Sequence, residues 1–184
     1  MGNRPAPDRL WFCLVAVLCA AASSACGYTL AGRGSFLPPY IKTIGVPTFT
    51  NRTTVFNLDT MLTQKVRAEF IGRGKYQILP QNTNVDALLI GDVTAVTIAP
   101  VGFTQQNLAS SYSVTMSARI EFRDTHENKV IWENPAVMFR QDYPATSGVR
   151  VTDAVAFFQQ DASALDRMSS EFARTIVSSI LEAF

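Results

Sequence analysis

The chain has 184 residues, of which 47% are hydrophobic and 17% are charged. These proportions fit one folded domain, or a small domain with a tail, and they exclude a largely disordered protein. With 16 basic and 15 acidic side chains the formal net charge is +1, which excludes a strongly basic nucleic-acid-binding protein and an acidic tail protein.

The N-terminal segment has the pattern of an export signal. Residues 1–9 are polar and weakly positive, and Leu10–Ala22 is an uninterrupted apolar run that small residues follow at positions 23–25. The run is shorter than the ~20 apolar residues needed to span a membrane. It also lacks the polar face of a globular helix, which disfavours a buried core helix. Residues 1–25 are therefore predicted to be a signal peptide.

Cys26 follows the small residues directly, where a bacterial lipoprotein carries its lipid-modified cysteine. The only other cysteines, Cys13 and Cys19, lie inside the apolar run, so Cys26 has no partner for an internal disulfide after cleavage. Lipid attachment at Cys26 is predicted, with an ordinary signal peptide and an incidental cysteine as the alternative. Several acyl chains on one cysteine would satisfy the requirement for stable anchoring. Residues 26–40 contain several glycines and prolines and are predicted to be a lipid-anchored tether.

The first part of the domain is predicted to be a compact αβ unit. Ile41–Pro47 is rich in β-branched residues, which favours a strand, and Tyr76–Leu79 favours a second one. Between them, Phe49–Thr54 is expected to be a loop, and Asn57 can cap a helix that Gly72 ends. The apolar positions of this helix recur at three and four residues: Leu58, Met61, Leu62, Val66 and Phe70.

In the middle of the chain the hydrophobic period changes to two. Ala87–Ile98 and Lys129–Tyr143 are rich in strand-forming residues, and Tyr112–Arg123 alternates apolar and polar side chains without a break. This alternation predicts strands with one buried face and one face that is wet or covered by a partner. An antiparallel meander follows, with Pro135 marking a bulge or an edge.

The C-terminal segment is predicted to be a long amphipathic helix that packs on the sheet. Asp161 is a suitable N-cap. The apolar stripe consists of Leu165, Met168, Phe172, Ile176 and Ile180. The predicted fold class is α+β, with two helices on one face of a mixed, mostly antiparallel sheet of about four strands. Residues 41–184 are expected to form this single domain.

The motifs of enzymes and cofactor sites are missing from the sequence. His126 is the only histidine, and no second histidine follows at the spacing of a zinc protease. No cysteine of the mature chain other than Cys26 is available as a metal ligand. Glu121 lies between Arg119 and Arg123 on one strand face, which suits an ion pair better than a catalytic acid. The chain is predicted not to be an enzyme and to use neither metal nor cofactor; a hydrolase with converging carboxylates stays a third hypothesis.

Two segments have composition typical of contact surfaces. Pro100–Ser111 joins two strands with uncharged polar and apolar residues, and it is longer than an ordinary hairpin connection requires. Tyr143–Gln160 contains Arg150 and two phenylalanines before the last helix. Each segment either contacts a partner or lipid, or is a surface loop with a few residues docked on the core.

Short motifs along the mature chain resemble the lipopolysaccharide-assembly lipoprotein family (LptE-like). The matching stretches run in order through the chain: Cys26–Leu30, Leu37–Pro38, Ile41–Pro47, Phe49, Asn51–Thr53, Asp59, Leu62–Thr63, Val66–Phe70, Asn84–Gly91, Tyr112 and Val130–Asn134. Each stretch is weakly specific, whereas their order and spacing together are fairly specific. The resemblance covers the chain from Cys26 to the last helix.

This resemblance implies a lipoprotein anchored on the periplasmic side of the outer membrane. It implies a plug inside an outer-membrane β-barrel lipopolysaccharide-assembly protein (LptD-like), which helps that barrel assemble and binds lipopolysaccharide; no nucleic acid is expected as a partner. Where the family has basic residues for lipopolysaccharide, this chain has Gln105-Gln106-Asn107 and Gln159-Gln160. The candidate barrel or lipopolysaccharide contacts are Phe103, Gln105, Gln106, Arg140, Arg150 and Gln160.

The same αβ pattern also fits a periplasmic lipoprotein with a different function. Such a protein would regulate a cell-wall enzyme or form a secretion assembly, and its opening strand would look much the same. The protein that copurifies with the chain distinguishes the two hypotheses, because a large barrel favours the first and a peptidoglycan synthase the second.

Overall fold

The computed structural model describes residues 37–145 and 153–183. Its helices and strands in chain order are β1 (Thr43–Gly45), β2 (Thr50–Asn51), α2 (Leu58–Gly72), β3 (Gln77–Leu79), β4 (Ala87–Phe103), β5 (Ala109–Asp124), β6 (Lys129–Pro144), α3 (Ala154–Gln160) and α4 (Ala162–Glu182). Among these residues, no helix has the length and apolar character needed to cross a membrane.

The strands form a mixed six-stranded sheet in the described part of the chain. Its order is β3-β1-β4-β5-β6, and the short β2 pairs with β4 beyond β1. The three long strands β4, β5 and β6 pair antiparallel, which confirms the predicted meander. β1 and β2 pair with β4 in parallel, and β3 pairs with β1 in parallel. The expected number of about four strands was too low. β3 lies within the predicted strand Tyr76–Leu79, whereas β2 forms in Phe49–Thr54, a segment expected to be a loop, because its two residues pair in parallel with Asp92 and Val93 of β4.

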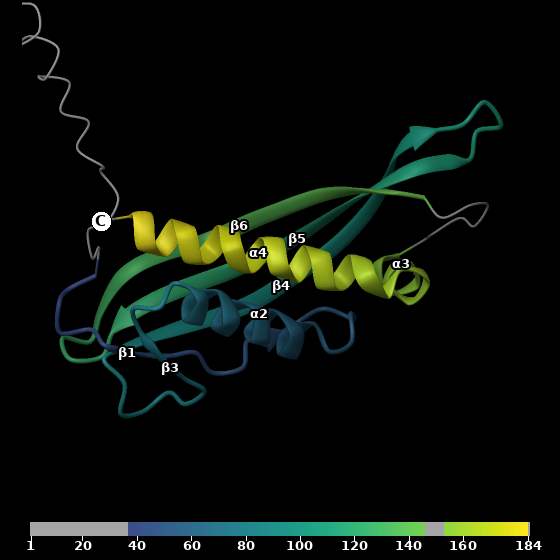
Figure 1. The fold of residues 1–184 in the computed structure, drawn as a ribbon. Helices are drawn as coiled ribbons and strands as arrows, with labels where there is room; N and C mark the ends of the chain where they lie inside the picture. Colours follow the sequence, from purple (N-terminus) through teal and green to yellow (C-terminus); the bar gives the residue numbers. More distant parts are fainter. Residues whose placement is uncertain (1–36, 146–152, 184) are drawn as a thin grey trace, which may run out of the picture. The chain divides into compact units, whose positions relative to one another are not determined.

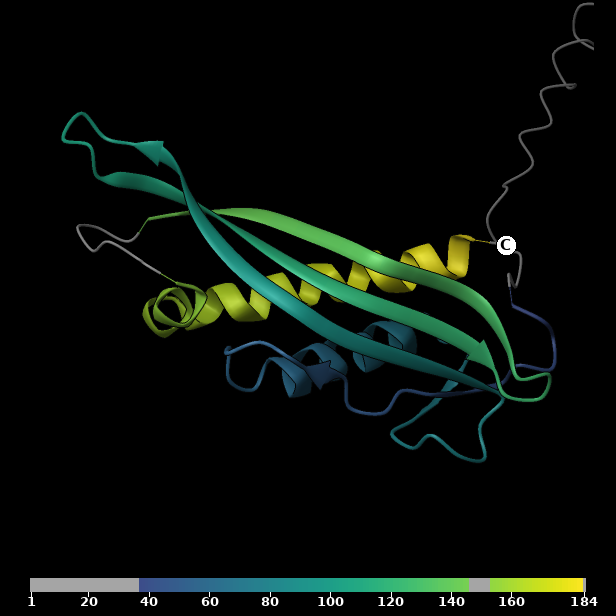
Figure 2. The same cartoon turned by 180° about the vertical axis from the view of Figure 1, so that it is seen from behind.

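Two helices cover one face of the sheet, as predicted, so the α+β class is confirmed. α2 and α4 lie side by side on this face, and no helix of the described residues lies over the other face of β4, β5 and β6 (Figures 1 and 2). Lys65 Nζ on α2 lies 2.6 Å from Asp166 Oδ1 on α4, which links the two helices at their surface. Phe70, Phe122 and Phe172 are fully buried and fill the space between the two layers.

The long C-terminal helix confirms the predicted apolar stripe. Asp161 caps α4, because its Oδ1 accepts a hydrogen bond of 3.0 Å from the backbone N–H of Ala164. The N-cap of α2 is Asn57, also as predicted, although its side chain makes no capping hydrogen bond. The backbone of Asn57 is instead left-handed, with φ 61°, a conformation that asparagine tolerates better than most residues.

Part of the segment expected to be a loop before α4 forms the short helix α3. Asp153 begins this helix, and its Oδ1 accepts a hydrogen bond of 2.9 Å from the backbone N–H of Ala156. Ala154, Phe157 and Phe158 are buried, so the apolar residues of this segment belong to the core. A helix of seven residues is too short for an apolar period to be evident in the sequence.

Ser169 has a hydroxyl group that is buried without a partner. The side chain lies within α4 at zero exposure, and no group in the described residues forms a hydrogen bond with its Oγ. A buried hydroxyl with no partner retains the cost of losing its water. We therefore expect Ser169→Ala to stabilise the fold by about 1 kcal/mol, measured by urea denaturation.

Ser170→Ala is the matched control for this substitution. The Oγ of Ser170 donates to the carbonyl oxygen of Asp166 at 2.8 Å and lies closer to solvent. Its removal is expected to change stability by less than about 0.5 kcal/mol. Equal stability of Ser169→Ala and the unchanged protein would contradict the prediction.

Candidate functional site

The hairpin of β4 and β5 extends beyond the helical layer at the end where α3 lies (Figures 1 and 2). Pro100–Ser111 was expected to be a loop, and this was wrong for most of the segment. β4 continues to Phe103, β5 begins at Ala109, and these two residues are paired across the strands. Register shifts after Pro100 and around Gly102 interrupt the regular pattern, which explains why the sequence looked like a loop.

This outer part of the hairpin carries no charge. Residues 93–118 contain no Asp, Glu, Lys, Arg or His. The residues that flank this stretch, Asp92 and Arg119, are opposite each other in the register of β4 and β5. Asp92 and Arg119 are therefore the last charged residues of the two strands before the turn. We name the uncharged part of the two strands and their turn, residues 93–118, the charge-free hairpin.

The tip of the charge-free hairpin exposes apolar side chains around a closed turn. Val101, Phe103 and Leu108 are 43%, 62% and 49% exposed. The backbone N–H of Thr104 donates to the carbonyl oxygen of Leu108 at 2.8 Å, and the N–H of Leu108 donates to Thr104 Oγ1 at 3.2 Å. The turn thus satisfies these backbone groups by itself, which lowers the cost of covering the tip with a partner.

An aromatic cluster fixes the charge-free hairpin where it leaves the helical layer. The ring of Phe157 on α3 lies 6.2 Å from that of Tyr112 on β5 and 5.5 Å from that of Tyr143 on β6. Burial raises the pKa of Tyr143 to about 12, although the nearby Arg167 guanidinium acts in the opposite direction. Tyr143 therefore stays protonated and donates its hydroxyl proton to Gln141 Oε1 at 3.0 Å.

The predicted contact residues do not form one cluster. Phe103, Gln105 and Gln106 lie together at the hairpin tip, and all three are exposed. Gln160 is the exposed last residue of α3. Within the described residues, no hydrogen bond or ion pair joins these side chains to one another or to Arg140.

Arg140 lies outside the tip, on the sheet face opposite α2 and α4. It is opposite Thr115 in the register, and its Nε donates to Ser113 Oγ at 2.6 Å. Asp142 Oδ1 is 3.8 Å from the same nitrogen, so a nearby carboxylate partly neutralises the cation. Arg150 and Cys26 lie outside the described residues, and their predicted roles stay predictions.

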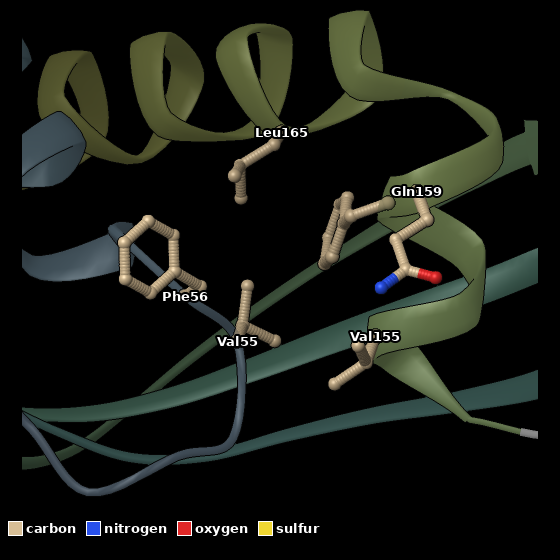
Figure 3. Close-up of a pocket in the computed structure, with 6 residues that line it drawn as sticks. Val55, Phe56, Val155, Gln159 and Leu165 are labelled. Atoms are coloured by element: carbon tan, nitrogen blue, oxygen red, sulfur yellow. The ribbon is translucent and has the colours of Figure 1, made fainter.

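A small apolar pocket was missed by the sequence analysis. It lies between the segment before α2, α3 and the start of α4, and its volume is about 150 Å³ (Figure 3). The lining residues are Val55, Phe56, Val155, Phe158, Gln159 and Leu165. These residues come from separate parts of the chain, so no local pattern signals the pocket. The one indication in the sequence was an apolar pair, Val55-Phe56, in a polar segment.

The chain's only histidine belongs to a hydrogen-bonded cluster at the other end of β4. His126 Nε2 is 2.9 Å from Asp86 Oδ1, and the hydroxyl of Tyr40 donates to Asp124 Oδ2. Asp86 Oδ2 also accepts hydrogen bonds from the backbone N–H groups of Lys42 and Thr43. The cluster joins the start of the described chain to the turn between β5 and β6.

The pKa values in this cluster follow from its hydrogen bonds. The bond with His126, followed by those from Lys42 and Thr43, holds the pKa of Asp86 well below its usual range. Burial alone would raise the pKa of Asp124, but hydrogen bonds from Tyr40 and the following turn outweigh it and lower this pKa. The bond to Asp124 raises the pKa of Tyr40 to about 12. Such a network holds both carboxylates ionised, which suits an ordered turn rather than proton transfer.

No group of His, Cys, Asp and Glu in the described residues has the arrangement of a metal site. Glu121 forms the expected ion pair, with its Oε1 2.6 Å from Arg123 Nη2. In the described part of the chain, the charge-free hairpin and the apolar pocket are surface features suited to binding a partner.

Several residues that carry the family resemblance have structural roles at the other end of the fold. Thr63 Oγ1 accepts a hydrogen bond of 2.9 Å from the backbone N–H of Phe49, which joins α2 to the segment before β2. Arg67 donates to the carbonyl oxygen of Val46 at 2.6 and 2.8 Å. The ring of Phe49 packs directly on Gly91 of β4. These motif residues hold α2 and the parallel strands on the sheet.

Comparison with solved structures places this architecture among known α+β domains. Rare lipoprotein B from Shewanella oneidensis aligns with a TM-score of 0.51 at 14% identity, covering 77% of this chain and 96% of that chain. The hypothetical protein CT253 from Chlamydia trachomatis aligns with a TM-score of 0.50 at 10% identity, covering 76% and 95%. The fold thus defines a class, the α+β domain seen in rare lipoprotein B.

The family follows from the sequence itself. The model of the LptE family, described as lipopolysaccharide-assembly, matches residues 41–180. The chain belongs to the LptE family, and the resemblance noted from its motifs is confirmed. A comparison with curated proteins gives no match.

Proposed function

We propose that the chain is the lipoprotein that plugs and helps assemble an outer-membrane β-barrel lipopolysaccharide translocon, and that it assists lipopolysaccharide insertion into the outer leaflet. Family membership over residues 41–180 is the observation that carries this proposal. Lipid attachment at Cys26 would anchor the protein on the periplasmic side of the outer membrane, with the folded domain free to enter the barrel.

The charge-free hairpin supports a role in which a partner covers the protein. A charged group is costly to remove from water, whereas an uncharged side chain that keeps its hydrogen bonds is not. The exposed tip residues Val101, Phe103 and Leu108 gain from being covered. We therefore assign the barrel contact to this hairpin and to the exposed amides Gln105 and Gln106.

Direct contact with lipopolysaccharide is proposed through uncharged groups. The positions where the family has basic residues hold glutamine and asparagine at the hairpin tip and glutamine at Gln159 and Gln160. Amide side chains can hydrogen-bond to sugar or phosphate oxygens but supply no ion pair. Arg140 and Arg150 are the candidate cations for this contact.

A pull-down from detergent-solubilised envelopes tests the function. Tagged wild-type protein and Cys26→Ala are isolated, and bound proteins are identified and quantified by mass spectrometry. We expect a stoichiometric lipopolysaccharide-export barrel with both, because the folded domain makes the complex. A peptidoglycan synthase or a secretion assembly in place of the barrel would overturn the proposal in favour of the second lipoprotein function.

Two charges placed at the hairpin tip test the assigned contact. The double substitution Phe103→Asp and Leu108→Asp should lower the amount of bound barrel at least tenfold, corresponding to about 1.4 kcal/mol or more. Ile71→Asp is the control, since Ile71 is 60% exposed at the end of α2 and lies outside the contact. Barrel recovery that is equal for the double substitution and the control would exclude the hairpin as the contact.

A further inference from the structure

The apolar pocket beside Phe56 has the size of one side-chain ring. Its volume is about 150 Å³. Pockets that bind drug-sized molecules are roughly 300–1,000 Å³. A protein cavity of about 150 Å³ lined by apolar side chains accepts a molecule the size of benzene. The volume therefore suits a single aromatic or branched aliphatic group.

The chemistry of the lining also favours an apolar group. Val55, Val155 and Leu165 present hydrocarbon to the pocket, and the Gln159 amide is the polar side chain of the lining (Figure 3). Phe158 also lines the pocket. The lining contains no charged residue. An occupant with a charge would lose its water without gaining a partner of opposite charge.

The exposure of the Phe56 ring to water is energetically unfavourable. Its side chain is 90% exposed, although phenylalanine is among the side chains that gain most from burial. It precedes Asn57, whose left-handed backbone begins α2. A large exposed ring at the rim of an apolar pocket is typical of a contact site rather than of a surface adapted to solvent.

The pocket and the base of the charge-free hairpin pack against the same buried aromatic cluster. Phe158 lines the pocket, and the neighbouring Phe157 contacts Phe158 at 5.3 Å between ring centroids. Phe157 in turn contacts Tyr112 at the base of the hairpin. Because α3 and the hairpin lie at the same end of the fold, a partner that covers the hairpin is also close to the pocket (Figure 1).

We infer that the pocket receives one aromatic or branched aliphatic side chain of the β-barrel partner, with Phe56 packing against the same partner segment. This inference rests on the proposed function, because the barrel is its occupant. The site would act as a second anchor beside the hairpin and would fix the rotation of the domain inside the barrel. A second copy of the chain and a lipid acyl chain are the other occupants that the test distinguishes.

A photo-crosslinking experiment tests the occupant. The photoreactive analogue benzoyl-phenylalanine is introduced at position 56 of the full-length lipoprotein, which is coexpressed with its barrel and irradiated in cells. Position 71 is the matched control, because Ile71 is an exposed apolar residue at the far end of α2. We expect a crosslink to the barrel at position 56 that is at least fivefold stronger than at position 71.

Each outcome of this experiment decides the inference. A product with twice the mass of the chain, or one that carries lipid alone, would overturn it by identifying a different occupant. Equal crosslinking at positions 56 and 71 would also overturn it. Failure of the proposed function is separate, because wild-type protein would then recover no barrel in the pull-down.

Filling the pocket provides an independent measurement. Val155 is half-buried at the pocket, so Val155→Phe adds a ring inside it with little change to the core. We expect at least a fivefold loss of barrel recovered after a detergent wash, with an unchanged melting temperature. Ile71→Phe adds the same ring elsewhere and should have no effect; equal recovery for both variants would contradict the assignment.

Discussion

Gly91→Ala is expected to destabilise the domain by about 2–3 kcal/mol, which is large for the addition of one methyl group. A Cβ at position 91 would lie 2.5–2.6 Å from three ring atoms of Phe49, far inside van der Waals contact. Phe49 is 3% exposed and is held by the hydrogen bond to Thr63, so its ring has little room to move. The predicted fall in melting temperature is about 5–10 °C, measured by circular dichroism.

Gly72→Ala is the matched control for this prediction. Gly72 ends α2, and a Cβ there would meet nothing within 4 Å. Because alanine is the better helix former, this substitution should be neutral or stabilising by up to about 1 kcal/mol. Similar stabilities for the two glycine variants would contradict the prediction, because they would show that the Phe49 ring can move to accommodate a methyl group at position 91.

The same contact predicts non-additive effects. In a Phe49→Ala background the clash is absent, so Gly91→Ala should cost much less than in the unchanged protein. A coupling energy of at least about 1 kcal/mol is expected for residues in direct contact. Additive effects would place the cause of the Gly91→Ala destabilisation elsewhere.

Asp86→Ala is expected to destabilise the domain by about 2–4 kcal/mol. Asp86 accepts hydrogen bonds from the backbone N–H groups of Lys42 and Thr43, from Thr43 Oγ1 at 2.8 Å, and pairs with His126. Hydrogen bonds to a charged acceptor are each worth more than neutral ones, and their loss removes the acceptor of the backbone donors of Lys42 and Thr43. Asp166→Ala is the control, since the exposed pair of Asp166 with Lys65 should contribute less than about 1 kcal/mol.

The pH dependence of stability follows from the same carboxylate. The pKa of Asp86 is lower in the folded than in the unfolded protein, where an aspartate has a pKa of about 3.9. Its contribution is therefore fully present above about pH 4 and is lost as the pH falls toward the lower folded value. Urea denaturation between pH 5 and 2 should show a smaller loss of stability for Asp86→Asn than for the wild type. Parallel curves would exclude Asp86 as a source of the acid sensitivity.

The sequence predicted those parts of the fold that depend on local periodicity. The apolar–polar alternation in residues 112–123 and the apolar stripe of the C-terminal helix each predicted one buried face. Both elements formed as expected. The parallel pairing of β1 with β3 and β4 was not predictable, since nothing within a three-residue strand specifies its partner. The charge-free hairpin was not predicted, because proline and glycine at positions 100 and 102 are typical of a loop. In the structure the strand pairing continues through both residues with shifts in register.

The candidate site was predictable only in part, for a physical reason. Phe103, Gln105 and Gln106 are contiguous in sequence, so their common position at the tip could be expected from the chain alone. The pocket beside Phe56 combines residues more than 100 positions apart and exists only after α3 and α4 are packed. The motifs that identify the family, such as Thr63 and Arg67, are used to hold the fold together and therefore indicate little about where a partner binds.

The absence of charged side chains from the hairpin beyond Asp92 and Arg119 has a kinetic consequence. Electrostatic steering can raise association rates by orders of magnitude, but it requires charge on the approaching surface. The two strands of the hairpin carry none beyond these residues, and Arg140 and Asp142 on the neighbouring β6 offset each other in charge. Docking through the hairpin tip would therefore proceed near the unsteered rate of roughly 10⁵–10⁶ M⁻¹ s⁻¹ and depend little on ionic strength. With the proposed lipid anchor at Cys26, confinement to the membrane plane rather than long-range attraction would then set how quickly the domain meets its partner, because tethering raises the effective concentration.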